Sequence, residues 1–331
     1  MVNVYLGCPG NGGQHHIFYE KKIIDTPENQ KDLEAINTLA GHDLVGIMLD
    51  KTRRHEITDE RDIQLAIVSS GLILAKKLRK KVDFEGVFGL SLGEITSCAV
   101  AGCIDDETAR YVVSKRAEFM KKCVPSLDDY ISEPDAPVNY MCAITHVPKR
   151  FIKKRCNHVN RRSKTYGYVL ISNENTPNQT VISGSSPAVH RAVRGITRKY
   201  SSAVIIPLKT GGPWHNKFYM EPARQEMIAL LEDIPFKSPD IPFYMMASMK
   251  FEKDPSRIKT NLTDAMILPV TTWESLCYIK KAGYALFMNL GPGRVLEPFF
   301  NSVGLNYITR SEVLEERIRK RESKSVSLSS L

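Results

Sequence analysis

A serine flanked by two glycines offers the clearest chemistry in this sequence of 331 residues. The segment Gly89-Leu90-Ser91-Leu92-Gly93 follows the apolar run Gly86-Val87-Phe88 and precedes a helical pattern. A G-x-S-x-G pattern between a strand and a helix is typical of a nucleophile elbow, a tight turn that exposes the serine hydroxyl above a sheet. In that geometry the N–H of Leu92 and the positive end of the helix face the oxygen on which negative charge develops. The motif predicts that Ser91 is the nucleophile of an acyl-transfer reaction.

A serine nucleophile needs a general base, and histidine is the side chain whose pKa suits that task near neutral pH. The chain contains eight histidines. His215 differs from the others because it follows the break Gly211-Gly212-Pro213-Trp214, directly after an expected strand. His215 is therefore the candidate base, although from the residues alone a histidine that only packs in a loop is the more frequent case.

The turn from Pro9 to Gln14 is rich in glycine and follows the first expected strand. A dinucleotide-binding G-x-G-x-x-G pattern would need glycine where His15 stands, and no Gly-Lys-Ser/Thr follows as in a phosphate-binding loop. Both nucleotide interpretations fail. The turn offers backbone N–H groups that can line an anion site.

Composition indicates a globular protein, with 42% hydrophobic and 25% charged residues. The longest mostly apolar stretch, Leu65 to Ala75, is too short for a membrane span, so we expect no membrane association. The chain starts with a strand-like segment instead of a signal-peptide pattern, which favours a cytoplasmic location. The net charge of +9 is concentrated in residues 149–164 and 317–324 and fits an acidic partner. Because no known nucleic-acid-binding motif accompanies these charges, we expect no nucleic-acid binding.

The seven cysteines are scattered, odd in number and never spaced C-x-x-C. This pattern argues against a disulfide framework and against a zinc site. We expect reduced, mostly buried thiols and no metal.

The first 125 residues alternate apolar strand-like runs with helical patterns. Strands are expected at 2–6 and 86–88, and helices at 29–38 and 60–80. This alternation predicts an α/β fold with a largely parallel sheet.

From about Asn139 the pattern changes to β-α-β-β-α-β, which is typical of a ferredoxin-like arrangement. The expected strands are 140–145, 168–171, 180–183 and 203–208, and the expected helices are 148–159 and 187–200. Parallel-sheet signals resume near Ala285. We therefore expect a large α/β-hydrolase-like subdomain formed by residues 1–135 and 206–318, an inserted small ferredoxin-like subdomain formed by residues 136–205, and a flexible tail at 319–331.

Seven motifs occur in a characteristic order between about Val4 and Gly304. They are Pro9 to Gln14, similar to P-G-Q-G-S-Q; Gln64, where a Thr-Gln-Pro-Ala helix start usually lies; Gly89 to Glu94, similar to G-H-S-L-G-E; Arg116, 25 residues after Ser91 and followed by Phe119-Met120; Asn173 to Gly184, similar to N-x-N-S-P-x-Q-x-V-I-S-G; His215 before Glu221-Pro222-Ala223 and the Pro269-Val270 and Trp273 of P-V-x-W; and Gly291 to Leu296, similar to G-P-G-K-V-L. Through them the chain resembles the malonyl-CoA:acyl carrier protein transacylases and related acyltransferases of fatty-acid and polyketide synthesis, discrete trans-acting acyltransferases included.

This resemblance implies a role for five residues. Ser91 would attack the thioester carbonyl, and His215 would take its proton. The backbone N–H groups of Asn11 and Leu92 would hold the oxyanion, and Arg116 would pair bidentately with the free carboxylate of a malonyl group. The resemblance also implies malonyl-CoA as the donor substrate, the phosphopantetheine thiol of an acidic acyl carrier protein as the acceptor, and no cofactor.

The chain departs from the family pattern at several pocket positions. Leu90 replaces the usual histidine before the nucleophile, and Asn11 replaces a glutamine. Trp214 stands where malonyl-selective relatives often have phenylalanine and methylmalonyl-selective ones serine, so it favours malonyl, although one methyl group is worth only about 1 to 3 kcal/mol. We expect Leu90, Trp214 and Gln64 to shape the pocket. Ala265 replaces a glutamine whose backbone carbonyl orients the histidine in relatives, and that carbonyl survives any side-chain change.

Two alternatives remain open at this point. One is an acyl hydrolase on the same scaffold that releases acyl groups from carrier proteins, against which Arg116 argues because an uncharged acyl group has no carboxylate to bind. The other is a catalytically weak carrier-binding protein, which the intact Ser91 and His215 disfavour. For the transacylase we expect a monomer.

Overall fold

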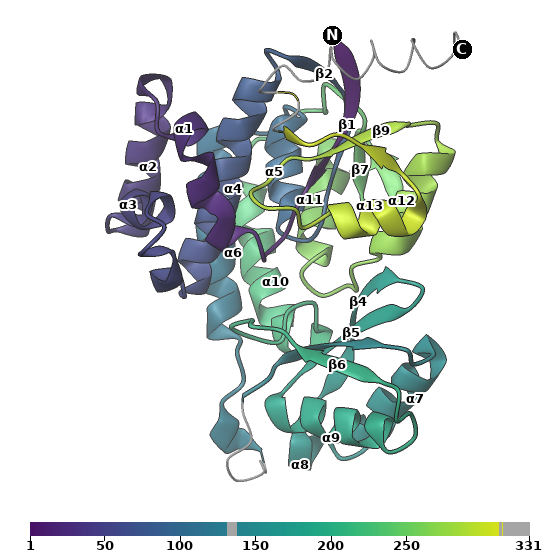
Figure 1. The fold of residues 1–331 in the computed structure, drawn as a ribbon. Coiled ribbons are helices and arrows are strands. Elements are labelled where there is room, and N and C mark those ends of the chain that lie inside the picture. Colours follow the sequence, from purple (N-terminus) through teal and green to yellow (C-terminus); the bar gives the residue numbers. More distant parts are fainter. Residues whose placement is uncertain (131–137, 311–312, 314–331) are drawn as a thin grey trace, which may run out of the picture.

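The computed structural model describes residues 1–130, 138–310 and 313, and Figure 1 shows their arrangement in two parts, each built on a sheet. The tail expected at 319–331 and the second basic stretch, 317–324, lie outside the described residues.

The larger sheet has six strands in the order β10-β9-β1-β2-β7-β8. Their bounds are β1 (Val2–Cys8), β2 (Val82–Gly89), β7 (Phe243–Met245), β8 (Lys250–Glu252), β9 (Leu286–Asn289) and β10 (Asn306–Tyr307). All neighbours pair in parallel except β7 and β8, which pair antiparallel. The expected α/β fold with a largely parallel sheet is confirmed.

Helices cover both faces of this sheet (Figure 1). They are α1 (Lys21–Ile24), α2 (Gln30–Ala40), α3 (Leu44–Leu49), α4 (Glu60–Leu78), α5 (Gly93–Val100), α6 (Asp106–Lys122), α10 (Lys217–Glu232), α11 (Pro255–Asp264), α12 (Thr272–Lys281) and α13 (Glu297–Val303), with short 3-10 helices at Gln14–Glu20, Pro27–Asn29, Arg54–Glu56 and Leu127–Asp129. Side chains alternate between the two faces along each strand. On β1, Leu6 joins the core under α4 and α5, whereas Tyr5 joins an aromatic cluster with Phe287 and Phe300 on the other face.

Helix α4 is the central helix of the larger part. Asp59 caps its N-terminus by accepting a hydrogen bond from the backbone N–H of Arg61, as acidic N-cap residues commonly do. Every residue from Ile63 to Ala75 is buried, including Ser69 and Ser70, because neighbouring elements surround this helix on all sides. This burial fixes the position of the two polar residues, Glu60 and Gln64, on its first two turns.

The smaller sheet has four antiparallel strands in the order β4-β5-β3-β6. Its elements are β3 (Met141–Thr145), α7 (Lys149–Asn160), α8 (Ser163–Tyr166), β4 (Val169–Thr176), β5 (Gln179–Gly184), α9 (Ser186–Thr197) and β6 (Val204–Pro207). The order of strands and helices is that of the expected ferredoxin-like unit. The boundary expected between residues 205 and 206 falls inside β6, and the division of the chain into subdomains stays a prediction.

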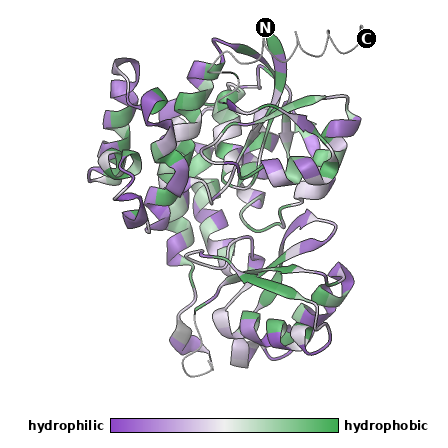
Figure 2. Cartoon of the chain, viewed as in Figure 1, coloured by the Kyte–Doolittle hydropathy of each residue, from purple (hydrophilic) through white to green (hydrophobic). Residues whose placement is uncertain are grey.

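Figure 2 shows hydrophobic residues along the strands of the small sheet and a mixture of hydrophobic and hydrophilic residues on the outer helices. The small sheet and its helices form their own apolar core, which includes Ile144, Ile152, Ile182 and Ile196. In the described part of the chain, no helix is both long enough and apolar enough to cross a membrane.

Candidate active site

Ser91 lies at the sharp turn between β2 and α5. Its φ of 55° is in the left-handed region, which is uncommon for a residue other than glycine. A Cβ on Gly89 would lie 2.1 Å from the backbone nitrogen of Glu94, and a Cβ on Gly93 would lie 2.0 Å from the carbonyl oxygen of Cys8. Only glycine fits these close approaches, so the two glycines of the motif are required by the packing of α5 against β1 and β2.

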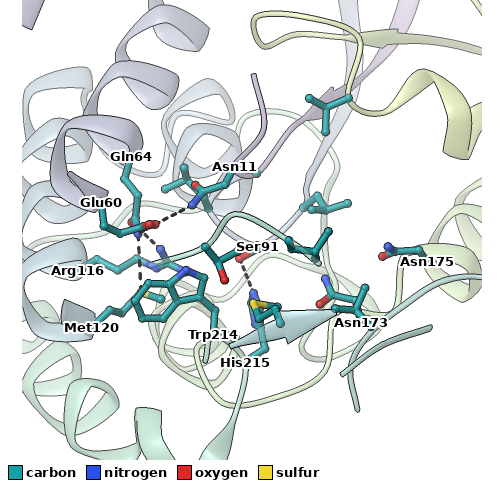
Figure 3. Close-up of a pocket in the computed structure, with 18 of the residues that line it drawn as sticks. Asn11, Glu60, Gln64, Ser91, Arg116, Met120, Asn173, Asn175, Trp214 and His215 are labelled. Carbon is teal, nitrogen blue, oxygen red and sulfur yellow. Dashed lines mark hydrogen bonds between the residues drawn. The ribbon is translucent and has the colours of Figure 1, made fainter. Parts of the chain in front are cut away.

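His215 lies beside Ser91, although 124 residues separate them (Figure 3). Its Nε2 is 2.7 Å from Ser91 Oγ, and its Nδ1 is 2.8 Å from the carbonyl oxygen of Ala265. Because a carbonyl oxygen only accepts, Nδ1 carries the proton and donates a hydrogen bond to the Ala265 carbonyl. The lone pair of Nε2 therefore faces the Ser91 hydroxyl, which is the tautomer that a general base needs.

The segment that carries His215 is held from both parts of the molecule. Asn216 caps α10 by accepting from the backbone N–H of Phe218 at 3.0 Å, and its Nδ2 donates to the carbonyl oxygen of Ser183 on β5 at 2.7 Å. The backbone of His215 has a φ of 57°, so both partners of the hydrogen-bonded pair adopt the left-handed conformation. His215 is buried, with 5% of its surface exposed.

The environment of His215 keeps its ring neutral. Burial and the positive charge of Arg116 together lower its pKa to about 4, although the carbonyls of Ala265 and Leu268 act in the opposite direction. A neutral imidazole at physiological pH is ready to accept the proton of Ser91.

Arg116 is buried on α6, with 5% of its surface exposed. Its Nη1 donates to Gln64 Oε1 at 2.6 Å, and none of the described carboxylates forms an ion pair with it. Burial lowers its pKa to about 10, with Glu60 and Glu94 acting to raise it, so Arg116 stays protonated at neutral pH. A buried cation without an ion-pair partner favours binding of an anionic group.

The side-chain amides of Asn11 and Gln64 both donate to one buried carboxylate, that of Glu60. Glu60 Oε1 accepts from Asn11 Nδ2 at 2.7 Å and from Gln64 Nε2 at 2.8 Å, and these bonds are drawn in Figure 3. Burial raises the pKa of Glu60, while its hydrogen bonds and the charge of Arg116 lower it. The chain Asn11–Glu60–Gln64–Arg116 thus connects the N-terminal turn to the guanidinium.

The N–H groups of Asn11 and Leu92 are available to a ligand, because neither donates to an acceptor among the described residues. Leu92 is the N-cap of α5, so its N–H stands at the positive end of that helix. The N-terminal turn approaches the elbow closely, since a Cβ on Gly10 would lie 2.8 Å from the carbonyl oxygen of Leu90. The arrangement suits an oxyanion between the two N–H groups.

These residues line one cavity of about 190 Å³ between the two sheets. Every predicted site residue lies on its wall: Asn11, Gln64, Leu90, Ser91, Leu92, Arg116, Trp214 and His215. Eleven further residues that line it were not predicted as site residues: Gly10, Glu60, Met120, Met141, Asn173, Asn175, Val181, Leu208, Thr210, Val295 and Phe299. Some of these, such as Val295, lie within the motifs quoted above. Outside the motifs, Glu60 has a sequence signal as an acid in the first turn of a helix that carries Gln64 four residues later.

The other histidines and the cysteines do not line this cavity. His15, His16 and His55 line a separate, more open cavity with Arg54 and Lys209. Within residues 1–130, 138–310 and 313, no three His, Cys, Asp or Glu side chains are grouped in a way that could hold a metal ion. The seven cysteines are free, and five of them are buried.

Comparison with known proteins shows which proteins the chain resembles. No protein-family model matches the chain. A malonyl CoA-acyl carrier protein transacylase of Salmonella typhimurium is 31% identical over 89% of this chain and 91% of its own length. One of Bacillus subtilis is 27% identical over 92% of this chain and 91% of its own length. Among solved structures, a malonyl-transacylase in complex with its type II PKS acyl-carrier protein superimposes with a TM-score of 0.83, covering 96% of this chain and all of that one at 23% identity.

Proposed function

The chain belongs to the malonyl-CoA:acyl carrier protein transacylase family, and from this premise we propose that Ser91 and His215 are its catalytic pair and Arg116 its substrate clamp. The enzyme transfers a malonyl group from CoA to an acyl carrier protein for fatty-acid or polyketide synthesis. The observation that carries the assignment of residues is the 2.7 Å contact between Ser91 Oγ and His215 Nε2. The cavity that holds this pair is also lined by Arg116, which has no ion-pair partner in the described part of the chain.

The first half of the reaction loads the enzyme. Ser91 Oγ attacks the thioester carbonyl carbon of malonyl-CoA while His215 Nε2 takes the hydroxyl proton. The N–H groups of Asn11 and Leu92 stabilise the oxyanion. When the C–S bond breaks, His215 returns the proton to the CoA sulfur, leaving neutral His215 and a malonyl ester on Ser91.

The second half reverses these steps with another thiol. His215 takes the proton of the phosphopantetheine thiol, and the thiolate attacks the ester carbonyl. When the ester C–O bond breaks, the proton returns to Ser91 Oγ, which regenerates the starting state of the enzyme. Throughout, Arg116 pairs bidentately with the malonyl carboxylate, as a guanidinium fork does with carboxylates.

The carrier protein is proposed as the macromolecular partner. The solved neighbour is bound to its own acyl-carrier protein. In this chain, the basic stretch 149–164 lies on α7 and α8 of the small subdomain, and this positive charge suits an acidic carrier. A monomeric, cytoplasmic enzyme stays a prediction, as does the preference that Trp214 gives for malonyl over methylmalonyl.

Intact mass after incubation with acyl-CoAs tests the proposal. The wild-type protein should gain one malonyl adduct from malonyl-CoA and lose it to an added acyl carrier protein, with little adduct from methylmalonyl-CoA. Free malonate without loading of the carrier would instead support the hydrolase alternative. The absence of any adduct would support a carrier-binding protein without activity.

The pH dependence of transfer tests the role of His215. Only the neutral imidazole accepts a proton, and its pKa lies near 4. Hence kcat/KM should stay level from about pH 8 down to about pH 5 and fall only below that. Acetyl-CoA is the suitable substrate because its acyl group carries no carboxylate. An acid limb centred near the ordinary histidine pKa of about 6.5 would contradict the buried, neutral base.

A further inference from the structure

Glu60 places a carboxylate in the pocket that is proposed to receive a second one. It is the first residue of α4 and is 6% exposed. It lines the same cavity as Ser91 and Arg116 (Figure 3). The catalytic steps described above do not use it, and a buried carboxylate costs free energy unless hydrogen bonds or a positive charge compensate it.

The two oxygens of Glu60 have different surroundings. Oε1 accepts both hydrogen bonds, from Asn11 Nδ2 and Gln64 Nε2. Oε2 has no hydrogen-bond partner among the described residues, and it faces the loop at Gly211, where a Cβ would lie 3.6 Å from it. A proton taken up by Glu60 therefore goes to Oε2, because Oε1 already accepts two donors and both bonds survive protonation.

Several charged groups act on Glu60. Arg116 on α6 favours its ionised form, whereas Asp59, the preceding residue, disfavours it. Asp59 is itself paired with Lys121 at 2.5 Å. Arg116 in turn acts on His215, which is neutral, and on Glu94, which burial keeps protonated by raising its pKa to about 8.

We infer that Glu60 is a positioning and specificity residue, which holds Asn11 and Gln64 in place and takes up a proton when a malonyl group binds beside Arg116. This inference rests on the proposed function. Without the proton, the pocket would hold two carboxylates against one guanidinium. With it, the pocket holds one carboxylate and one guanidinium, and Glu60 Oε2 gains an O–H that can donate to a neighbouring oxygen. In the binding reaction, malonyl-CoA binds to the enzyme with ionised Glu60, and one proton is taken up from solution. The product is a complex in which Glu60 is neutral.

The sign of the pH effect follows from this balance. Burial raises the pKa of Glu60 above its ordinary value, so a rise in pH through that pKa ionises Glu60 in the free enzyme. The KM for malonyl-CoA should then rise by up to about tenfold per pH unit, because binding must recover the proton. Below that pKa the KM should be level. The KM for acetyl-CoA should show no such rise, since an acetyl group brings no charge to the pocket.

The Glu60→Gln variant tests the inference. It keeps an oxygen acceptor for Asn11 and Gln64 but removes the charge, so its malonyl-CoA KM should stay level with pH and should lie below that of the wild type at the alkaline end. Glu60→Ala removes the acceptor as well and should lower kcat for both substrates, because Asn11 loses its anchor. Glu252→Gln is the matched control: Glu252 is also 6% exposed, but it lies on β8 and does not line the cavity, so its malonyl-CoA profile should follow the wild type.

Calorimetry of the inactive Ser91→Ala variant in buffers of different ionisation enthalpy gives a second readout that does not depend on activity. Binding of malonyl-CoA should be accompanied by the uptake of as much as about one proton more than binding of acetyl-CoA. The added Glu60→Gln change should remove this difference. A malonyl-CoA KM that rises equally in wild type and Glu60→Gln, or equal proton uptake for the two ligands, would overturn the inference. Failure of the proposed function would look different, since the wild type would then form no malonyl adduct on Ser91.

Discussion

Replacing Ser91 by alanine should abolish the malonyl adduct and lower the rate of malonyl transfer by about 10,000-fold or more, as loss of a catalytic nucleophile does in serine enzymes. The variant removes the Oγ that contacts His215 Nε2 and leaves the cavity otherwise intact. The measurement is intact mass for the adduct, together with the rate at which the carrier protein is loaded.

Ser70→Ala provides the matched control for this loss. Ser70 is a fully buried serine on α4, and its Oγ has no hydrogen-bond partner among the described residues. This variant should keep the adduct and the transfer rate. Thermal unfolding of both variants separates loss of chemistry from loss of fold. An adduct that persists on Ser91→Ala would place the nucleophile elsewhere.

Replacing Arg116 by alanine should reverse the acyl preference of the enzyme. Each charge-assisted hydrogen bond to the malonyl carboxylate contributes about 1.5 to 3 kcal/mol, so the loss of two should lower kcat/KM for malonyl-CoA by about 100-fold or more. The value for acetyl-CoA should change little, because the acetyl group makes no contact that depends on the guanidinium. Competition between the two acyl-CoAs, read by intact mass, measures the preference directly.

Arg110→Ala separates this effect from the general cost of removing a buried arginine. Arg110 lies on the same helix, is 3% exposed and donates to Asp32 at 2.7 Å, away from the cavity. Its loss should lower the free energy of unfolding without changing the acyl preference. Unchanged preference in Arg116→Ala would remove the clamp from the mechanism.

Much of the fold was predictable because it depends on local periodicity and chain order. The alternation of strands and helices in the first 125 residues predicts a parallel sheet, and the β-α-β-β-α-β order predicts the small antiparallel one. Both predictions agree with the observed strand orders. The antiparallel pairing of β7 with β8 was not predictable, because three-residue strands leave too short a pattern to recognise.

The site was predictable where a motif carries it and not where packing makes it. Ser91 was predictable because its turn requires the two glycines of the motif. The sequence around Arg116 predicts only an arginine on a helix, and its role as a carboxylate ligand was predicted from the resemblance to a family. The partner of His215 is the backbone carbonyl of Ala265, which the resemblance to the family indicates although the side chain there departs from the family pattern. Glu60 enters the pocket because Asn11 and Gln64 converge on it, and that convergence depends on tertiary structure.

The small sheet begins and ends at neighbouring points. β3, its first strand, pairs with β6, its last, and the N–H of Leu208 after β6 donates to the carbonyl oxygen of Met141 at 2.9 Å. Segments whose ends lie this close can be exchanged between proteins with little disturbance of the host. The segment from β3 to β6, which carries the basic residues proposed to contact the carrier protein, can thus be transferred between relatives as one unit. A chimera that takes this segment from a relative should retain the catalytic pair and acquire that relative's choice of carrier.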